Sequence, residues 1–191
     1  MDTPHIVAHK IKRLLKRLHK RGHYAKRQCE LKHSNSNQAV RIKVLEELCK
    51  CKMQIGYIIL EKQKVYPELQ GNPNRLYNYL IVHTIMTNIV PKLTSSDKLV
   101  IILDKSLSGS SKEAFNEYAR NKASWVVRIE EREYPVELSN IEVLHLSFHN
   151  EPCLQAVDFL AGVCFHKYER NNKSNFQRIE QKIEYFNYYW K

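Results

Sequence analysis

Glycine and proline are scarce in this sequence, with 5 Gly and 6 Pro among 191 residues. This scarcity excludes collagen-like repeats and low-complexity linkers. No apolar run reaches the roughly 18 residues that a membrane-spanning helix needs, and the best candidate, Leu76–Pro91, is interrupted by polar side chains. The N-terminus also lacks the uninterrupted apolar stretch of a secretory signal. We therefore expect a cytoplasmic protein with no membrane span.

A disulfide framework is equally disfavoured, because the chain has five cysteines, an odd number. Cys49 and Cys51 form a C-x-C pair with Cys29 and His33 upstream. This spacing matches none of the common zinc-finger patterns. Phosphate-binding glycine loops, the G-x-S-x-G element and the H-E-x-x-H element are also missing.

Positive charge is abundant and unevenly distributed. The formal net charge is +11 and the pI is near 9.4. The first fifty residues carry 13 basic and 4 acidic side chains, so +9 of this charge lies there. A localised basic surface attracts polyanions such as nucleic acid or anionic lipid, although it can also be a merely solvated face. The candidate nucleic-acid-binding residues of this region are Arg13, Lys16, Arg17 and Lys20.

Apolar periodicity predicts an α/β fold in which helices alternate with the strands of a mixed sheet. Helices are expected over His5–Arg21, from a Ser34–Asn37 cap to about Cys51, from Pro73 to about Leu93, from the Ser-rich loop to about Lys122, over Pro152–Arg170 and over Asn175–Trp190. Strands are expected over Met53–Leu60, Leu99–Leu103, Trp125–Ile129 and Ile141–Leu146. We expect a single domain over residues 1–191 that ends in a C-terminal helix from about residue 175.

Three carboxylates have neighbourhoods that are unusual for solvated acids, although Glu30, taken alone, is only a Glu between two basic residues. Asp104 ends the most apolar strand, where α/β sheets present their active groups, unless it simply forms a turn. Asp158 lies in a helical register whose apolar face comprises Leu154, Val157, Ala161 and Phe165. Burying a charge costs several kcal/mol, so Asp158 is expected to have a metal ion, a basic partner or several hydrogen-bond donors.

Three sequence elements resemble the domain-of-unknown-function 3800 family. Glu30-Leu31-Lys32 before a Ser-containing turn resembles that family's E-[LI]-K-x-S element, and the strand ending in Asp104 is similar to another. Ser147 followed by the segment Gln155–Gly162 is similar to its S…Q-x-A-D-x-x-A-G element. The resemblance extends from about His5 to Arg170. It implies a ribonuclease H-like mixed sheet flanked by helices, and a metal-dependent nuclease that hydrolyses phosphodiester bonds.

The resemblance also implies a set of functional residues. The carboxylates of Glu30, Asp104 and Asp158 would be catalytic and would hold Mg²⁺ or Mn²⁺, hard cations that prefer oxygen ligands and activate water. Lys32 and Lys105 would bind the phosphates of the nucleic acid. Outside the ligands, supporting hydrogen bonds would come from Ser106, Ser147 and Gln155.

One departure from the family pattern concerns its start. Family members open with a strand carrying Asp-Glu-Ser-Gly and then a second strand, whereas here Asp2 precedes a predicted helix and cannot be matched. We therefore expect an N-terminally shortened, poorly active chain in which strand Leu99–Leu103 has an open apolar edge. Either Met53–Leu60 pairs directly with that edge or another chain covers it by self-association.

Two other functions compete with the nuclease. The first is a non-catalytic nucleic-acid-binding module, which the basic helix and the missing first Asp favour. The second is a peripheral membrane protein that uses the basic amphipathic helix His5–Arg21. The sequence does not distinguish DNA from RNA as the nucleic-acid partner.

Overall fold

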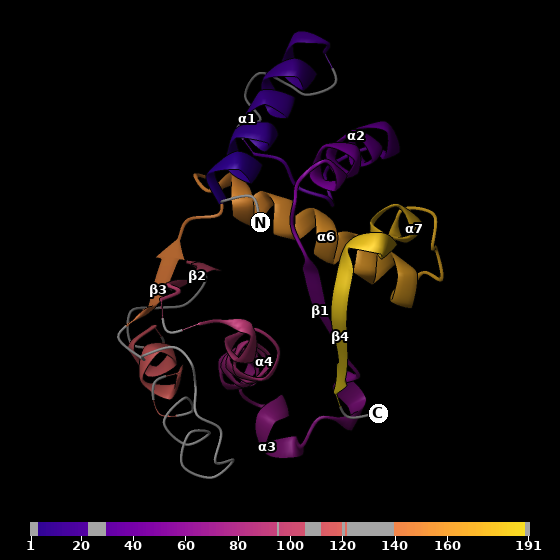
Figure 1. The fold of residues 1–191 in the computed structure, drawn as a ribbon. Helices are drawn as coiled ribbons and strands as arrows, with labels where there is room; N and C mark the ends of the chain where they lie inside the picture. The colour runs from indigo at the N-terminus through magenta and orange to yellow at the C-terminus, as the bar shows by residue number, and fades with distance from the viewer. Residues whose placement is uncertain are drawn as a thin grey trace. The chain divides into compact units, whose positions relative to one another are not determined.

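The computed structural model describes residues 4–22, 30–94, 96–105, 112–119, 121 and 140–189. The fold is mixed α/β, as the sequence predicts, with two small parallel sheets (Figure 1). In chain order the labelled helices and strands are α1 (Pro4–Lys20), α2 (Gln38–Cys49), β1 (Ile55–Leu60), α3 (Pro67–Gln70), α4 (Pro73–Asn88), β2 (Leu99–Asp104), β3 (Ile141–Leu146), α6 (Pro152–Glu169), α7 (Phe176–Ile179) and β4 (Ile183–Tyr189). Residues 112–119 form a further helix.

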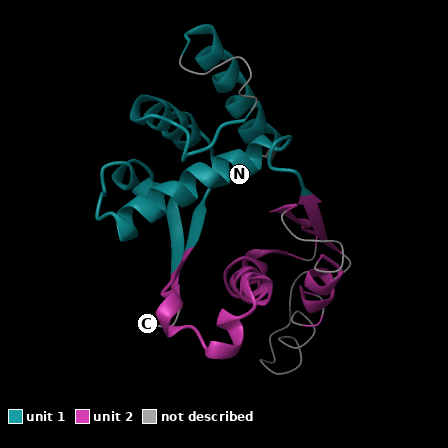
Figure 2. Cartoon of the chain, turned by 180° about the vertical axis from the view of Figure 1, so that it is seen from behind, with its two compact units in different colours: residues 1–57, 146–186 teal, residues 58–145, 187–191 magenta. Residues whose placement is uncertain are grey.

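The chain divides into two compact units (Figure 2). Unit 1 comprises residues 1–57 and 146–186, and unit 2 comprises residues 58–145 and 187–191. Each unit has its own hydrophobic cluster. A single ribonuclease H-like domain stays a prediction.

Helix α1 packs on the core of unit 1 through one apolar stripe. Ile11, Leu14 and Leu18 recur every three or four residues and are almost fully buried. They pack with buried side chains of α2 and α6, among them Val44 and Phe159. Complete burial of such a side chain contributes about 1.5–3 kcal/mol, so this stripe fixes α1 to the unit.

The C-terminal region differs from the predicted helix over Asn175–Trp190. A single helical turn, α7, and a 3₁₀ turn (Glu180–Lys182) lead into strand β4, which pairs with β1. Tyr and Phe favour strands because their rings pack on a pleated surface. Gly56 of β1 makes the pairing feasible, because a Cβ at this position would overlap the Tyr185 ring.

Unit 2 is built around α4, sheet β2-β3 and the helix over residues 112–119. Its buried cluster includes Val82 and Met86 of α4, Ile101 and Leu103 of β2, and Phe115. Helix α4 ends at Asn88, earlier than predicted, because Pro91 cannot continue a helix and lies in a 3₁₀ turn.

The pairing of β2 corrects one expectation. Strand β2 pairs with β3, whereas β1 pairs with β4 in the other sheet. Direct pairing of Met53–Leu60 with Leu99–Leu103, one of the two alternatives, is therefore not found among the described residues. The predicted strand Trp125–Ile129 lies outside the described residues.

Candidate functional site

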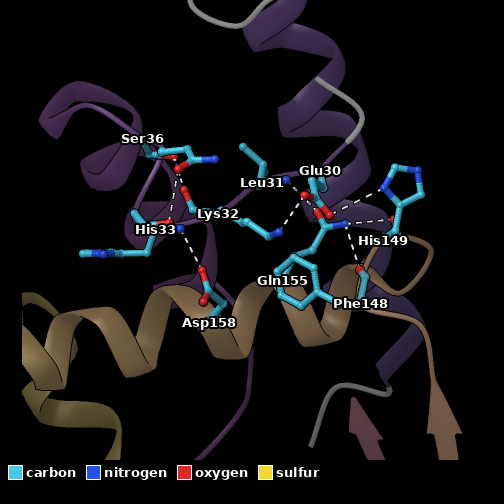
Figure 3. Close-up of polar contacts among 11 residues, drawn as sticks. Glu30, Leu31, Lys32, His33, Ser36, Phe148, His149, Gln155 and Asp158 are labelled. Carbon is cyan, nitrogen blue, oxygen red and sulfur yellow. Dashed lines mark hydrogen bonds and ion pairs between the residues drawn. The ribbon is translucent and has the colours of Figure 1, made fainter. Parts of the chain in front are cut away.

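Helix α6 holds the backbone of residues 30–36 by two side chains (Figure 3). The Leu31 N–H donates to Gln155 Oε1 at 3.1 Å, and the His33 N–H donates to Asp158 Oδ2 at 2.7 Å. Gln155 Nε2 also donates to the carbonyls of Phe148 and His149, both at 3.3 Å. Gln155 therefore links this segment to the turn that precedes α6.

The carbonyl groups of the same segment also have side-chain partners. Ser36 Oγ donates to the Lys32 carbonyl at 2.7 Å, and Arg41 Nε donates to the His33 carbonyl at 3.1 Å. Polar backbone groups that are withdrawn from water need such partners. In this segment, side chains form the hydrogen bonds with the backbone that a neighbouring strand would form in a sheet.

Spacing on α6 explains why this arrangement forms. Gln155, Asp158 and Gly162 follow one another at three and four residues, so they lie on one face of the helix. Gln155 and Asp158 accept hydrogen bonds from the 30–36 segment, whereas Gly162, which has no side chain, leaves room for a side chain of that segment. A Cβ at Gly162 would overlap the His33 imidazole. The Q-x-x-D-x-x-A-G element is thus a structural clamp on the segment.

Glu30 lies at the start of the clamped segment and is neutralised locally. Its carboxylate is 2.8 Å from Lys32 Nζ and 3.5 Å from His149 Nδ1. The hydrogen bond from Lys32 lowers the pKa of Glu30, and the charges of Lys32 and His149 lower it further. Partial burial acts in the opposite direction and raises this pKa, but by less. Lys32 also lies 5.2 Å from the centre of the Phe148 ring. Glu30 is therefore ionised and already paired with a cation.

The environment of Asp158 corrects the predicted apolar face. Leu154 is buried, but Val157 is 58% and Phe165 is 51% exposed, and Ala161 is exposed as well. The buried side of α6 is instead the side that carries Phe159, and Asp158 is half-buried at the edge of that side. The backbone N–H of His33 is the hydrogen-bond donor that the structure shows for the Asp158 carboxyl group, and metal binding by Asp158 stays a prediction.

Asp104 belongs to unit 2, whereas Glu30 and Asp158 belong to unit 1. Asp104 ends β2, as predicted, and is half-buried. Burial and the charge of Asp104 both raise the pKa of Tyr77 on α4, so the carboxylate faces this helix. The structure thus brings Glu30 and Asp158 to one segment, and the convergence of all three carboxylates stays a prediction.

The other candidate residues lie in ordinary local settings. Lys105 is exposed directly after β2. The Ser147 carbonyl accepts hydrogen bonds from the N–H groups of Asn150 and Glu151, within the turn that begins α6. Ser106 lies outside the described residues. The predicted roles of these residues toward phosphates or metal ligands stay predictions.

A metal centre is not preformed in the described part of the chain. Among these residues, no three His, Cys, Asp or Glu side chains are grouped to hold a metal ion. Cys49 and Cys51 donate their thiols to backbone carbonyls of Arg178 and Glu47, and Cys29 is outside the described ranges. Binding of Mg²⁺ or Mn²⁺ by Glu30 and Asp158 stays a prediction.

The opposite side of α1 from its buried stripe is cationic. Lys12, Arg13, Lys16, Arg17 and Lys20 are all exposed, and together they are termed the cationic face of α1. Arg17 is the one of these five with an ion pair to α2, at 3.2 Å from Glu47. The predicted basic helix is therefore present, with its charges directed to solvent.

Sequence reasoning missed two residues of the clamp, His33 and Gly162. His33 is 5% exposed, lies edge-on to Phe159 and His166, and its buried Nε2 has no hydrogen-bond partner among the described residues. Burial, with the nearby charges of Arg41 and His166, lowers its pKa to about 4. The signal available in the sequence was a glycine inside an otherwise apolar helix. Such a glycine indicates that another part of the chain packs closely against the helix at that position.

Comparisons with known proteins leave the geometry as the basis for assigning function. No family model, curated protein or solved structure matches the chain. In the described residues, no helix is both long enough and apolar enough to cross a membrane.

Proposed function

We propose that this chain binds nucleic acid through the cationic face of α1. The observation that carries this proposal is the division of α1 into two sides. Ile11, Leu14 and Leu18 fix one side in the core of unit 1, so the basic side chains are presented on a rigid support. A regular array of cations on a helix suits the phosphate backbone, which dominates nucleic-acid affinity.

The same division argues against a lipid surface as the partner. An interfacial helix inserts its apolar face into the headgroup region. In α1 this face is occupied by the protein's own core, with Ile11 and Leu18 each 1% exposed. Ile6, near the start of α1, is 41% exposed. The other exposed side chains that the structure describes on the helix are Lys, Arg or His, and nucleic acid requires no apolar insertion.

Individual side chains differ in their availability for phosphate. Arg17 is drawn toward Glu47, and Lys10 Nζ donates to the Lys50 carbonyl at 3.0 Å. Arg13, Lys16 and Lys20 are exposed and point to the solvent side. We assign most of the phosphate contacts to these three.

The test is a salt series with a fluorescein-labelled DNA duplex, followed by anisotropy. The variant R13A/K16A/K20A removes three cations from α1, and R170A/K173A/R178A removes three exposed cations elsewhere in unit 1 as a matched control. Each phosphate contact contributes about 0.9 to the slope of log affinity against log salt. We expect the α1 variant to flatten the slope by about 2–3 and the control to leave it unchanged. An unchanged slope in the α1 variant would contradict the proposal.

A second proposal is metal-dependent hydrolysis of phosphodiester bonds by a ribonuclease H-like member of the domain-of-unknown-function 3800 family. The observation favouring it is that Glu30 and Asp158, matched by resemblance to catalytic carboxylates, flank the same clamped segment. Asp104 would have to join them, and Mg²⁺ or Mn²⁺ would supply the activated water.

Cleavage of labelled single- and double-stranded DNA and RNA, with and without Mg²⁺ or Mn²⁺, tests this second proposal. D104N and D158N should abolish metal-dependent cleavage, and D97N, in an exposed loop, should not. Asn at position 158 keeps an oxygen that accepts the His33 N–H, which limits effects on folding. Binding without cleavage under every metal condition would leave the non-catalytic module as the function.

A further inference from the structure

Unit 2 contains a cavity of about 670 Å³ that the nucleic-acid proposal does not use. It lies between α3, the first half of α4 and the helix over residues 112–119, and its wall includes Glu68, Asn74, Arg75, Asn78, Tyr79 and Tyr118. Sites for small ligands typically measure about 300–1,000 Å³. The cavity therefore has the size of a site for one small organic molecule.

Side-chain amides give the cavity wall its polar character. Asn72, Asn74 and Asn78 all contribute to it. Asn74 is exposed, so its amide is open to a ligand in the cavity. Amides carry both a donor and an acceptor, which matches the edge of a nucleobase.

Aromatic rings and a guanidinium complete the wall. Tyr79 and Tyr118 are half-buried, and the Tyr79 ring is stacked on His83 at 5.6 Å with an interplanar angle of 5°. Burial and Tyr79 raise the pKa of Tyr118, and the charge of Arg75 lowers it, so these three side chains are neighbours. Arg75 is exposed at the rim of the cavity.

We infer that this cavity binds a nucleotide. The base stacks on the tyrosine rings and forms a hydrogen bond with the Asn74 amide, and the phosphate pairs with Arg75. Glu68 at the rim accepts hydrogen bonds from the ribose hydroxyls. Aromatic side chains stack well with bases of any sequence, and guanidinium is well suited to phosphate. This site lies in unit 2 and does not rest on nucleic-acid binding by α1.

The probes are the four common nucleoside 5′-monophosphates, with ribose 5-phosphate and glucose as controls, added to the full chain. Saturation-transfer NMR detects binding, and calorimetry gives the dissociation constants. We expect at least one nucleotide to bind, with saturation transferred mainly to its base protons, and glucose not to bind. Absence of transfer to every nucleotide at millimolar concentration would overturn the inference, as would equal affinity for ribose 5-phosphate.

Variants locate the ligand. R75A should weaken binding at least about tenfold, because it removes the charged hydrogen-bond donor that pairs with the phosphate, whereas R170A should not change it. N74L should also lose affinity, because it removes the exposed amide that the base contacts. Equal affinity in R75A and R170A would overturn the site, as would loss of nucleotide binding in R13A/K16A/K20A, which would place the ligand on α1.

Discussion

The imidazole of His33 occupies the space over Gly162 on α6 that the methyl group of an alanine would fill. These residues are far apart in sequence, yet the fit is close on both sides, since His33 also lies edge-on to Phe159, with ring centres 5.7 Å apart. The same loop residue donates its N–H to Asp158, one helical turn away from Gly162. The 30–36 segment is thus held by shape and by hydrogen bonds together.

Replacing Gly162 by Ala should destabilise the protein, although Ala is the better helix former. Helix propensity alone would favour Ala by about 0.8–1 kcal/mol. Overpacking against His33 should outweigh this gain, since it typically costs about 1–3 kcal/mol. Urea unfolding measures the difference. Gly71→Ala is the matched control, because nothing lies within 4 Å of a Cβ there. A G162A variant as stable as G71A would contradict the close contact.

Replacing Gln155 by Leu should cost about 1–3 kcal/mol of stability, because it leaves the Leu31 N–H buried without its acceptor. Gln177→Leu, an exposed position on α7, should change stability by less than about 0.5 kcal/mol. Thermal and urea unfolding provide the comparison. Amide exchange at Leu31 gives a local reading, and slow exchange in Q155L would show that the side chain does not hold this group.

Stability should fall on acidification between about pH 6.5 and pH 4 because of His33. Its pKa in the folded chain is about 4, against about 6.5 for an unperturbed histidine. In this window the unfolded chain takes up a proton that the folded chain does not, so the free energy of unfolding decreases as pH falls. His33→Gln should flatten this dependence, and His9→Gln, at an exposed position, should not. If the free energy of unfolding depended on pH in the same way in H33Q and in the unaltered chain, His33 would not be the cause of this dependence.

Self-association through a sheet edge is expected from strand β2. Among the residues that the structure describes, β2 pairs with β3 in a sheet of two strands, and Val100 is 41% exposed. Edge strands with exposed apolar residues template pairing with other chains, and a lysine opposes this. Light scattering over a concentration series should show association of the unaltered chain and a shift toward monomer in Val100→Lys. Identical profiles for the two chains would place any association elsewhere.

The sequence predicted those elements whose periodicity is unambiguous. Helix α1 and strand β2 follow from spacing and from a continuous apolar run. The start of α2 follows from the Asn37 cap, whose side-chain oxygen accepts the Val40 N–H at 3.0 Å. The C-terminal helix failed because the aromatic residues of β4 prefer a strand once a partner such as β1 is available, which is a long-range effect.

The candidate site was also predicted only in part, because spacing along a helix shows which residues share a face but not what they contact. Spacing indicated that Gln155 and Asp158 share a face of α6, and both do contact the 30–36 segment. What spacing could not show is that their partners are backbone N–H groups, because these belong to residues more than 120 positions away. The expected burial of Asp158 beside Val157 failed since apolar residues on a helix do not all face the core.

The most direct measurement for the central proposal is an NMR titration of the isotope-labelled chain with a short DNA duplex. Paired bases in a duplex cannot enter the unit 2 cavity, so the titration reports on the phosphate contacts alone. We expect the largest amide shift changes among the exposed residues of α1, centred on Arg13, Lys16 and Lys20, and their reversal at high salt. Shift changes confined to residues outside α1, or changes that persist at high salt, would contradict nucleic-acid binding by this face.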